Sequence, residues 1–214
     1  MTPKVITPPD VEPITLEQAR AHLEAASYGD SDGDPIDELD DLMIMGLVAA
    51  AREHCEDFLG LSLSPRVLEI ALDNFPSTTV EGRTYIELPM GPVSEIVSIT
   101  IPDASGDSDD TDADPMEESD YVLDDFSVPA RVVPVAGWPS MTSGTNAIRI
   151  RYAAGYAIDS DGVSEIPATF RAAMLLVLGH LYANREENTE KAMTSLPFGV
   201  EALLRPRRVL LGMA

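Results

Sequence analysis

The sequence is poor in cysteine and in basic residues. Its one cysteine, Cys55, excludes any disulfide within the chain, which fits a reducing cytoplasm. Only 14 Lys and Arg residues stand against 37 Asp and Glu residues, and the formal net charge is −23 at pH 7. Because nucleic-acid backbones and anionic membranes are bound mainly through Lys and Arg, this balance argues against a protein that wraps DNA or docks on a lipid surface.

Long hydrophobic runs are also missing. The longest, Ala172 to Gly179, is far shorter than the roughly 20 residues that a membrane-spanning helix needs. The first residues, MTPKVITPPDVEPIT, contain several prolines and no apolar run of signal-peptide length. With 44% hydrophobic residues over 214 positions, the chain can bury a real core in one or two domains. We expect a soluble protein that is made and used inside a cell.

Recognisable catalytic motifs are absent as well. The three histidines, His22, His54 and His180, are far apart in the sequence and do not have the close spacing of a zinc motif. No G-x-S-x-G pattern, Walker A sequence or dinucleotide-binding glycine pattern occurs. Carboxylates are so abundant that no general acid/base pair can be singled out. We therefore expect no enzymatic activity, no catalytic residue and no cofactor.

One acidic stretch, YGDSDGDP at 28–35, resembles a cation-binding loop. Its carboxylates Asp30, Asp32 and Asp34 match positions 1, 3 and 5 of an EF-hand. The EF-hand glycine at position 6 is replaced by Pro35, and position 12 is Asp41 instead of Glu. The pattern favours a solvated acidic loop and no metal site, with a calcium-stabilised structural module as the alternative.

Two helices are predicted in the first quarter of the chain. Thr15 and Gln18 form a capping box that starts a helix over about 15–26. Asp37 can cap a second helix, whose apolar residues recur at spacings of three and four until Gly60 stops it. Cys55 lies on this apolar stripe, which favours a small buried side chain over a reactive thiol.

The hydrophobic period then changes from helical to alternating. Between Ser64 and Tyr156, six short segments alternate apolar and polar residues and are separated by turn signals, which predicts an antiparallel β-domain. The six segments are VLEIALDNF, TYIEL, VSEIVSITI, DYVL, ARVVPV and NAIRIRY. The stretch 102–120 has nine carboxylates and no base, so we expect it to be a mobile loop.

The C-terminal part returns to the helical period. Pro167 suits the first turn of a helix that is apolar almost all round, which predicts burial on several sides, within the fold or against other copies of the chain. After a short last helix, Pro206 interrupts the chain. The segment beyond Leu204 is expected not to fold back on its own subunit, and it is either a frayed end or a docking peptide. Its basic and apolar residues are Arg205, Arg207, Arg208, Val209, Leu210 and Leu211.

Together these patterns predict an α+β fold, in which a helical layer carries an inserted, mainly antiparallel β-domain. The helical layer consists of an N-terminal helix pair and a long C-terminal helix. The expected parts are an extended arm (1–14), N-terminal helices (15–63), the inserted β-domain (64–156), C-terminal helices (164–204) and a docking tail (205–214).

The order of these segments resembles the head–tail connector (adaptor) proteins of tailed bacteriophages. The resemblance runs from about residue 14 to 208 and includes the branch with a β-domain between its helices, to which gene-transfer-agent proteins are related. It is carried by the ordered segments ITLEQARAHL, DDLMIMGLVAAAREHCEDFLG, IELPMGPVSEIVSI, NAIRIRYAAGY, IPATFRAAMLLVLGHLYANRE and LPFGVEALLRPRR.

This resemblance implies a structural virion protein, assembled in a bacterial host cytoplasm. It implies a ring, usually a dodecamer, that lies beneath the portal, extends the DNA channel and presents a platform to a downstream head-closure or tail protein. DNA would pass through the ring without specific binding, and the tail from Arg205 to Leu211 would engage the portal. Another virion ring component, such as a head-closure or tail-terminator protein, is the alternative within the same class.

Overall fold

The computed structural model describes residues 2–27, 38–76, 84–101, 115–140, 144–160, 162–184 and 198–209. These residues form four α-helices and two antiparallel sheets, so the predicted α+β class is confirmed. The chain divides into two compact units, each discontinuous in sequence. The β unit comprises Met1–Asp10, Gly60–Gly155 and Val209–Ala214, and the helical unit comprises Val11–Leu59 and Tyr156–Arg208.

The helical unit contains α1 (Leu16–Ser27), α2 (Glu38–Leu59), α3 (Ala168–Ala183) and α4 (Phe198–Leu204), followed by the short 3-10 helix η2 (Arg205–Arg207). The capping box before α1 is confirmed. The Thr15 hydroxyl accepts a hydrogen bond from the Gln18 N–H at 3.2 Å, and the Gln18 carbonyl Oε1 accepts one from the Thr15 N–H at 3.3 Å. The predicted cap of α2, Asp37, lies outside the described residues.

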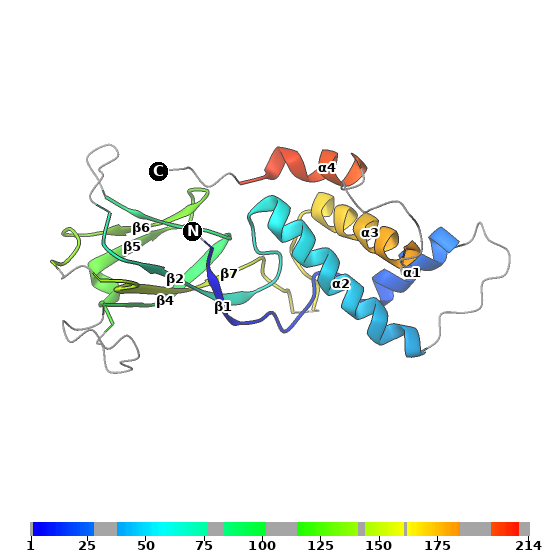
Figure 1. The fold of residues 1–214 in the computed structure, drawn as a ribbon, viewed down its shortest axis with the longest axis horizontal. Coiled ribbons are helices and arrows are strands. Elements are labelled where there is room, and N and C mark those ends of the chain that lie inside the picture. Colours follow the sequence, from blue (N-terminus) through cyan, green and yellow to red (C-terminus); the bar gives the residue numbers. More distant parts are fainter. Residues whose placement is uncertain are drawn as a thin grey trace. The chain divides into compact units, whose positions relative to one another are not determined.

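The core of the helical unit is built around α3, which packs against α1, α2 and α4 (Figure 1). Its buried residues recur at helical spacing along one broad face: Phe170, Ala173, Met174, Val177 and Leu178. The opposite side of α3 is less covered, because Leu176 remains 43% exposed. Three helices of the same unit thus cover one broad face of α3, and Leu176 on its other side stays partly open to solvent.

The β unit contains a four-stranded and a three-stranded sheet. The first has the order β1 (Lys4–Thr7), β2 (Arg66–Leu72), β7 (Ile148–Ala154) and β4 (Val93–Thr100); the second has the order β3 (Ile86–Leu88), β6 (Ala130–Pro134) and β5 (Tyr121–Asp124). All neighbouring strands are antiparallel (Figure 1). All six strands predicted between 64 and 156 form.

The alternating pattern places the core of the β unit between its two sheets. Leu68 and Ile70 of β2 lie opposite Tyr152 and Ile150 of β7, and all four side chains are buried. They share one cluster with residues of the second sheet, including Leu88 and Val132. The hydroxyl of Tyr152 donates a 2.7 Å hydrogen bond to the carbonyl of Pro89, and burial raises the pKa of this phenol.

Two segments are more ordered than the sequence patterns indicate. Lys4–Thr7 of the expected extended arm pairs with β2 as an edge strand, and none of its side chains is buried. The acidic loop is shorter than 102–120, because the Met116 N–H donates a hydrogen bond to the Ile99 carbonyl and Glu118–Asp120 forms a 3-10 turn, η1. Residues 102–114 lie outside the described part of the chain. Among the described helices, none is long and apolar enough to cross a membrane.

Candidate docking segment

The predicted docking residues follow α4 at the C-terminal end of the chain. Arg205, Arg207, Arg208 and Val209 are described, whereas Leu210 and Leu211 lie outside the described residues. The weak metal candidates Asp30, Asp32 and Asp34 also lie outside them. Among the residues that are described, no group of three or more His, Cys, Asp or Glu side chains could hold a metal ion.

Helix α4 fixes where the docking segment begins. Its residues Val200 and Leu204 are completely buried, so the helix is held by packing despite its short length. At its end the backbone tightens into η2, where Pro206 occupies the first turn. The guanidinium of Arg205 lies 2.9 Å from the Glu201 carboxylate one turn earlier, and the side chains are 77% and 38% exposed. This exposed pair orients Arg205 without burying its charge.

The next two arginines fold back onto the helical unit. The Cζ atom of Arg207 lies 5.9 Å from the centre of the Phe170 ring, and that of Arg208 lies 5.0 Å from the centre of the Phe58 ring. A guanidinium over an aromatic face is attracted by the ring quadrupole, and its edge stays free for hydrogen bonds. The expectation that this segment does not fold back on its own subunit is therefore wrong for Arg205–Arg208.

No side chain of η2 is buried, and all three arginines are exposed. Burial raises the pKa of nearby Tyr156, while the positive charge of Arg207 acts in the opposite direction. The structure thus presents three cationic groups along one short segment, held at its start by Glu201 and further along by aromatic rings. Such a segment can recognise carboxylates on another molecule.

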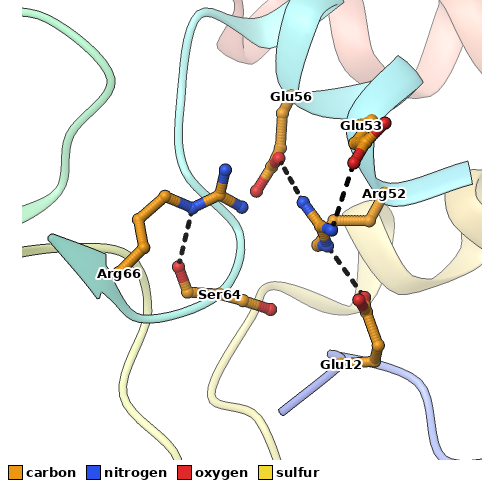
Figure 2. Close-up of polar contacts among 6 residues, drawn as sticks. All are labelled: Glu12, Arg52, Glu53, Glu56, Ser64 and Arg66. Carbon is orange, nitrogen blue, oxygen red and sulfur yellow. Dashed lines mark hydrogen bonds and ion pairs between the residues drawn. The ribbon is translucent and has the colours of Figure 1, made fainter. Parts of the chain in front are cut away.

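A buried ion network that sequence analysis did not identify lies on α2. Figure 2 shows Arg52 between Glu12, which precedes α1, and Glu56, one turn further along α2. Its guanidinium is 2.8 Å from each of these two carboxylates and 3.6 Å from exposed Glu53. The Arg52 and Glu56 side chains are only 5% and 3% exposed. The available signal was a charged residue within the apolar stripe of α2.

The electrostatics of this network stabilise the charged arginine. Burial alone lowers the pKa of Arg52, but its hydrogen bonds and charge interactions with Glu12 and Glu56 outweigh burial and raise that pKa. Beside it, burial and then the negative charge of Glu56 raise the pKa of the Cys55 thiol to about 12. Cys55 is completely buried, so the predicted role as a small hydrophobic side chain is confirmed.

Comparison with known proteins supplies the fold relationship. No protein-family model matches the chain, and no curated protein matches it. A chain from the neck of an empty gene transfer agent (GTA) particle, computed with C6 symmetry, matches with a TM-score of 0.71 and 20% identity. The match covers 100% of this chain and 98% of that chain. This chain has the fold of a GTA neck chain.

Two further structures give the same relationship. A chain in the virion of the native GTA particle matches with a TM-score of 0.71, and one in the neck of the native particle, computed with C12 symmetry, matches with 0.66. Both are 20% identical to this chain, with 100% of this chain and 98% of the other covered. The match extends over both units, so the whole chain shares the fold of these neck and virion chains.

Proposed function

We propose that this protein is a structural virion protein of the head–tail connector (adaptor) type. In this role it forms a ring, most simply a dodecamer, beneath the portal, extends the DNA channel and joins the head to a downstream head-closure or tail protein. The observation that carries the proposal is the match of the whole chain, at a TM-score of 0.71, to a chain from the neck of a GTA particle.

The charge of the chain supports a conduit for DNA. A net charge of −23 repels phosphate, so DNA can pass without being held. Several of the few basic side chains are also neutralised within the fold. Arg52 is buried between carboxylates, Arg151 lies 2.6 Å from Glu69, and Arg20 lies 2.5 Å from Asp41.

Exposed apolar residues on the helices support association with further copies of the chain. Leu176 on α3 is 43% exposed and Leu42 on α2 is 85% exposed, although both lie on helices whose other faces form the core. A head-to-tail contact between such helix faces produces a closed ring when the rotation from one copy to the next divides a full turn into equal steps.

The docking segment supports attachment to the portal. The three arginines Arg205, Arg207 and Arg208 are exposed and can pair with portal carboxylates. The apolar residues that follow, Val209, Leu210 and Leu211, can fill an apolar groove between portal subunits.

A truncation that spares every described contact tests this role. Deletion of residues 210–214 removes Leu210 and Leu211 but retains the stacking of Arg207 and Arg208. We expect the truncated protein to keep its fold and its oligomeric state, measured by circular dichroism and native mass spectrometry. Particles assembled with it should lose DNA or lack tails in electron micrographs. The matched control is Val97→Ser, which removes a 51% exposed valine from β4, a strand that takes no part in the proposed docking or ring contacts.

Each result has a separate meaning. If the truncated protein completes particles at the normal efficiency, the docking role is wrong and residues 210–214 are not needed for attachment to the portal. If the full-length purified protein forms no ring and is absent from particles, the connector function itself is wrong.

A further inference from the structure

The hairpin between β5 and β6 carries the most exposed aromatic side chain that the structure describes. Phe126 is 96% exposed, and Val128 in the same hairpin is 71% exposed. Single exposed hydrophobic residues are common on protein surfaces, but an almost bare phenylalanine next to further exposed valines is typical of an interaction site. The function proposed above makes no use of this hairpin.

The hairpin is held in shape by Asp124. One carboxylate oxygen of Asp124 accepts the N–H of Ser127 at 3.2 Å, and the other accepts the Ser127 hydroxyl at 2.6 Å. The hydrogen bond from the Ser127 hydroxyl is the main cause of the lowered pKa of Asp124. Because these bonds close the turn around Phe126, the ring is presented by an ordered loop, which reduces the entropy lost on binding.

The sheet next to this hairpin has an uncovered apolar face. Tyr121 and Leu123 of β5 point into the core, so Val122 points to the other side, where Val133 of β6 lies directly opposite. Val122 is 56% exposed and Val135 is 63% exposed. We call Val122, Val133 and Val135 the outer valine face. It lines a shallow groove of about 620 Å³ together with Thr84, Asp124, Pro134 and Gly137.

The surroundings of the outer valine face are acidic. The described strands and turns of this sheet, at 84–88 and 115–135, contain one base, Arg131, whose guanidinium stacks on the Tyr85 ring at 4.4 Å. The carboxylates in the same stretches are Glu87, Glu117, Glu118, Asp120, Asp124 and Asp125. A partner for this surface therefore needs basic residues around an apolar contact.

We propose that Phe126 and the outer valine face form a docking surface for a different protein of the particle neck, whose contact segment presents apolar side chains flanked by Lys or Arg. A second copy of this chain fits poorly, because its net charge of −23 would face an acidic rim, and its basic, apolar segment Arg205–Leu211 is assigned above to the portal. This inference rests on the proposed function only in that the partner is sought in the particle.

Photocross-linking in assembled particles tests the identity of the partner. A photoreactive phenylalanine derivative, p-benzoylphenylalanine, replaces Phe126, and the matched probe replaces Leu42 on α2. From position 126 we expect a cross-link to a different virion protein, mapped to a segment with Lys or Arg beside apolar residues, and no such cross-link from position 42. Cross-links from position 126 only to copies of this chain, or none at all, would overturn the inference.

A substitution then tests how much the Phe126 side chain contributes to binding of the partner. Phe126→Ser is expected to leave the melting temperature unchanged, because the side chain is 96% exposed. It should lower the amount of the cross-linked partner retained per copy of this chain at least tenfold, as expected for an aromatic anchor. The control is Val97→Ser, a 51% exposed valine on β4 of the other sheet, with no loss expected.

The outcomes separate the two proposals. If Phe126→Ser particles contain this chain and retain the partner at the normal ratio, the docking surface is wrong and the connector function stands. If the unmodified chain is absent from particles, both proposals fail.

Discussion

Replacing Arg52 by alanine should destabilise the helical unit strongly, and more than replacing Arg20 by alanine. The guanidinium holds two carboxylates, Glu12 and Glu56, at 2.8 Å each. Its own side chain is 5% exposed, and those of Glu12 and Glu56 are 17% and 3% exposed. With alanine at this position, each carboxylate would lose the charge-assisted hydrogen bond that Arg52 donates. Both negative charges would then remain in a poorly solvated site.

The expected cost follows from this burial. Breaking a buried ion pair by removing one partner costs about 3–5 kcal/mol, because the remaining charge loses its compensation. This is a large share of a total stability that is about 5–15 kcal/mol for a typical protein. An exposed pair behaves differently, since water already solvates both charges, and it contributes about 1 kcal/mol or less.

Urea unfolding followed by circular dichroism measures the difference. The matched control is Arg20→Ala, which removes the partner of Asp41 in a pair whose side chains are 33% and 26% exposed. We expect a lower urea midpoint for Arg52→Ala with an unchanged slope, and a clearly smaller loss of stability for the control, because water reaches both charges of this partly exposed pair. Glu12→Gln should lower the free energy of unfolding less in the Arg52→Ala variant than in the unmodified protein, because its partner is already missing. A loss for Arg52→Ala as small as that for Arg20→Ala would refute the argument.

Three further predictions concern Cys55 and Gly155. The Cys55 thiol, with its pKa raised to about 12, should react with a disulfide reagent far more slowly in the folded protein than in urea; fast labelling of the folded protein would contradict this. Because its folded pKa exceeds the ordinary value of 9.0, its contribution to stability is present below that pH and is lost as the pH rises toward 12. Gly155→Ala should lower stability by about 2 kcal/mol or more, since a Cβ there would lie 2.2 Å from the Ser64 carbonyl oxygen at a φ of +120°. Gly137→Ala, with a φ of +103° and open space around it, should cost clearly less in the same thermal melt, and equal losses would contradict the steric argument.

Features that depend on neighbouring residues could be predicted from the sequence. The Thr15–Gln18 capping box and the stop of α2 at Gly60, whose φ is +70°, each involve only a few consecutive positions. The six strands between 64 and 156 follow from local alternation. What could not be predicted is contact between distant segments. The pairing of Lys4 with Glu69 and the ion pair of Glu12 with Arg52 leave no local pattern.

The candidate site divides in the same way. Its composition, three arginines followed by apolar residues, is visible in the sequence from Arg205 onward. The stacking of Arg207 on Phe170 and of Arg208 on Phe58 depends on two separate helices, α3 and α2, and could not be predicted. The hairpin that presents Phe126 was predicted only as a turn between two strands, because exposure depends on what the rest of the sheet leaves uncovered.

The insertion of the β unit between α2 and α3 has a consequence for synthesis on the ribosome. Helices α1 and α2 pack against α3, yet α3 begins roughly 100 residues after α2 ends. The ribosome adds about 5–20 residues per second, so the apolar stripes of α1 and α2 remain without their main packing partner, α3, for roughly 5–20 s. The strands from β2 to β7 emerge together during that interval and can fold first. A chaperone that binds the growing chain would therefore be expected to bind the apolar faces of α1 and α2, before α3 is made and covers them.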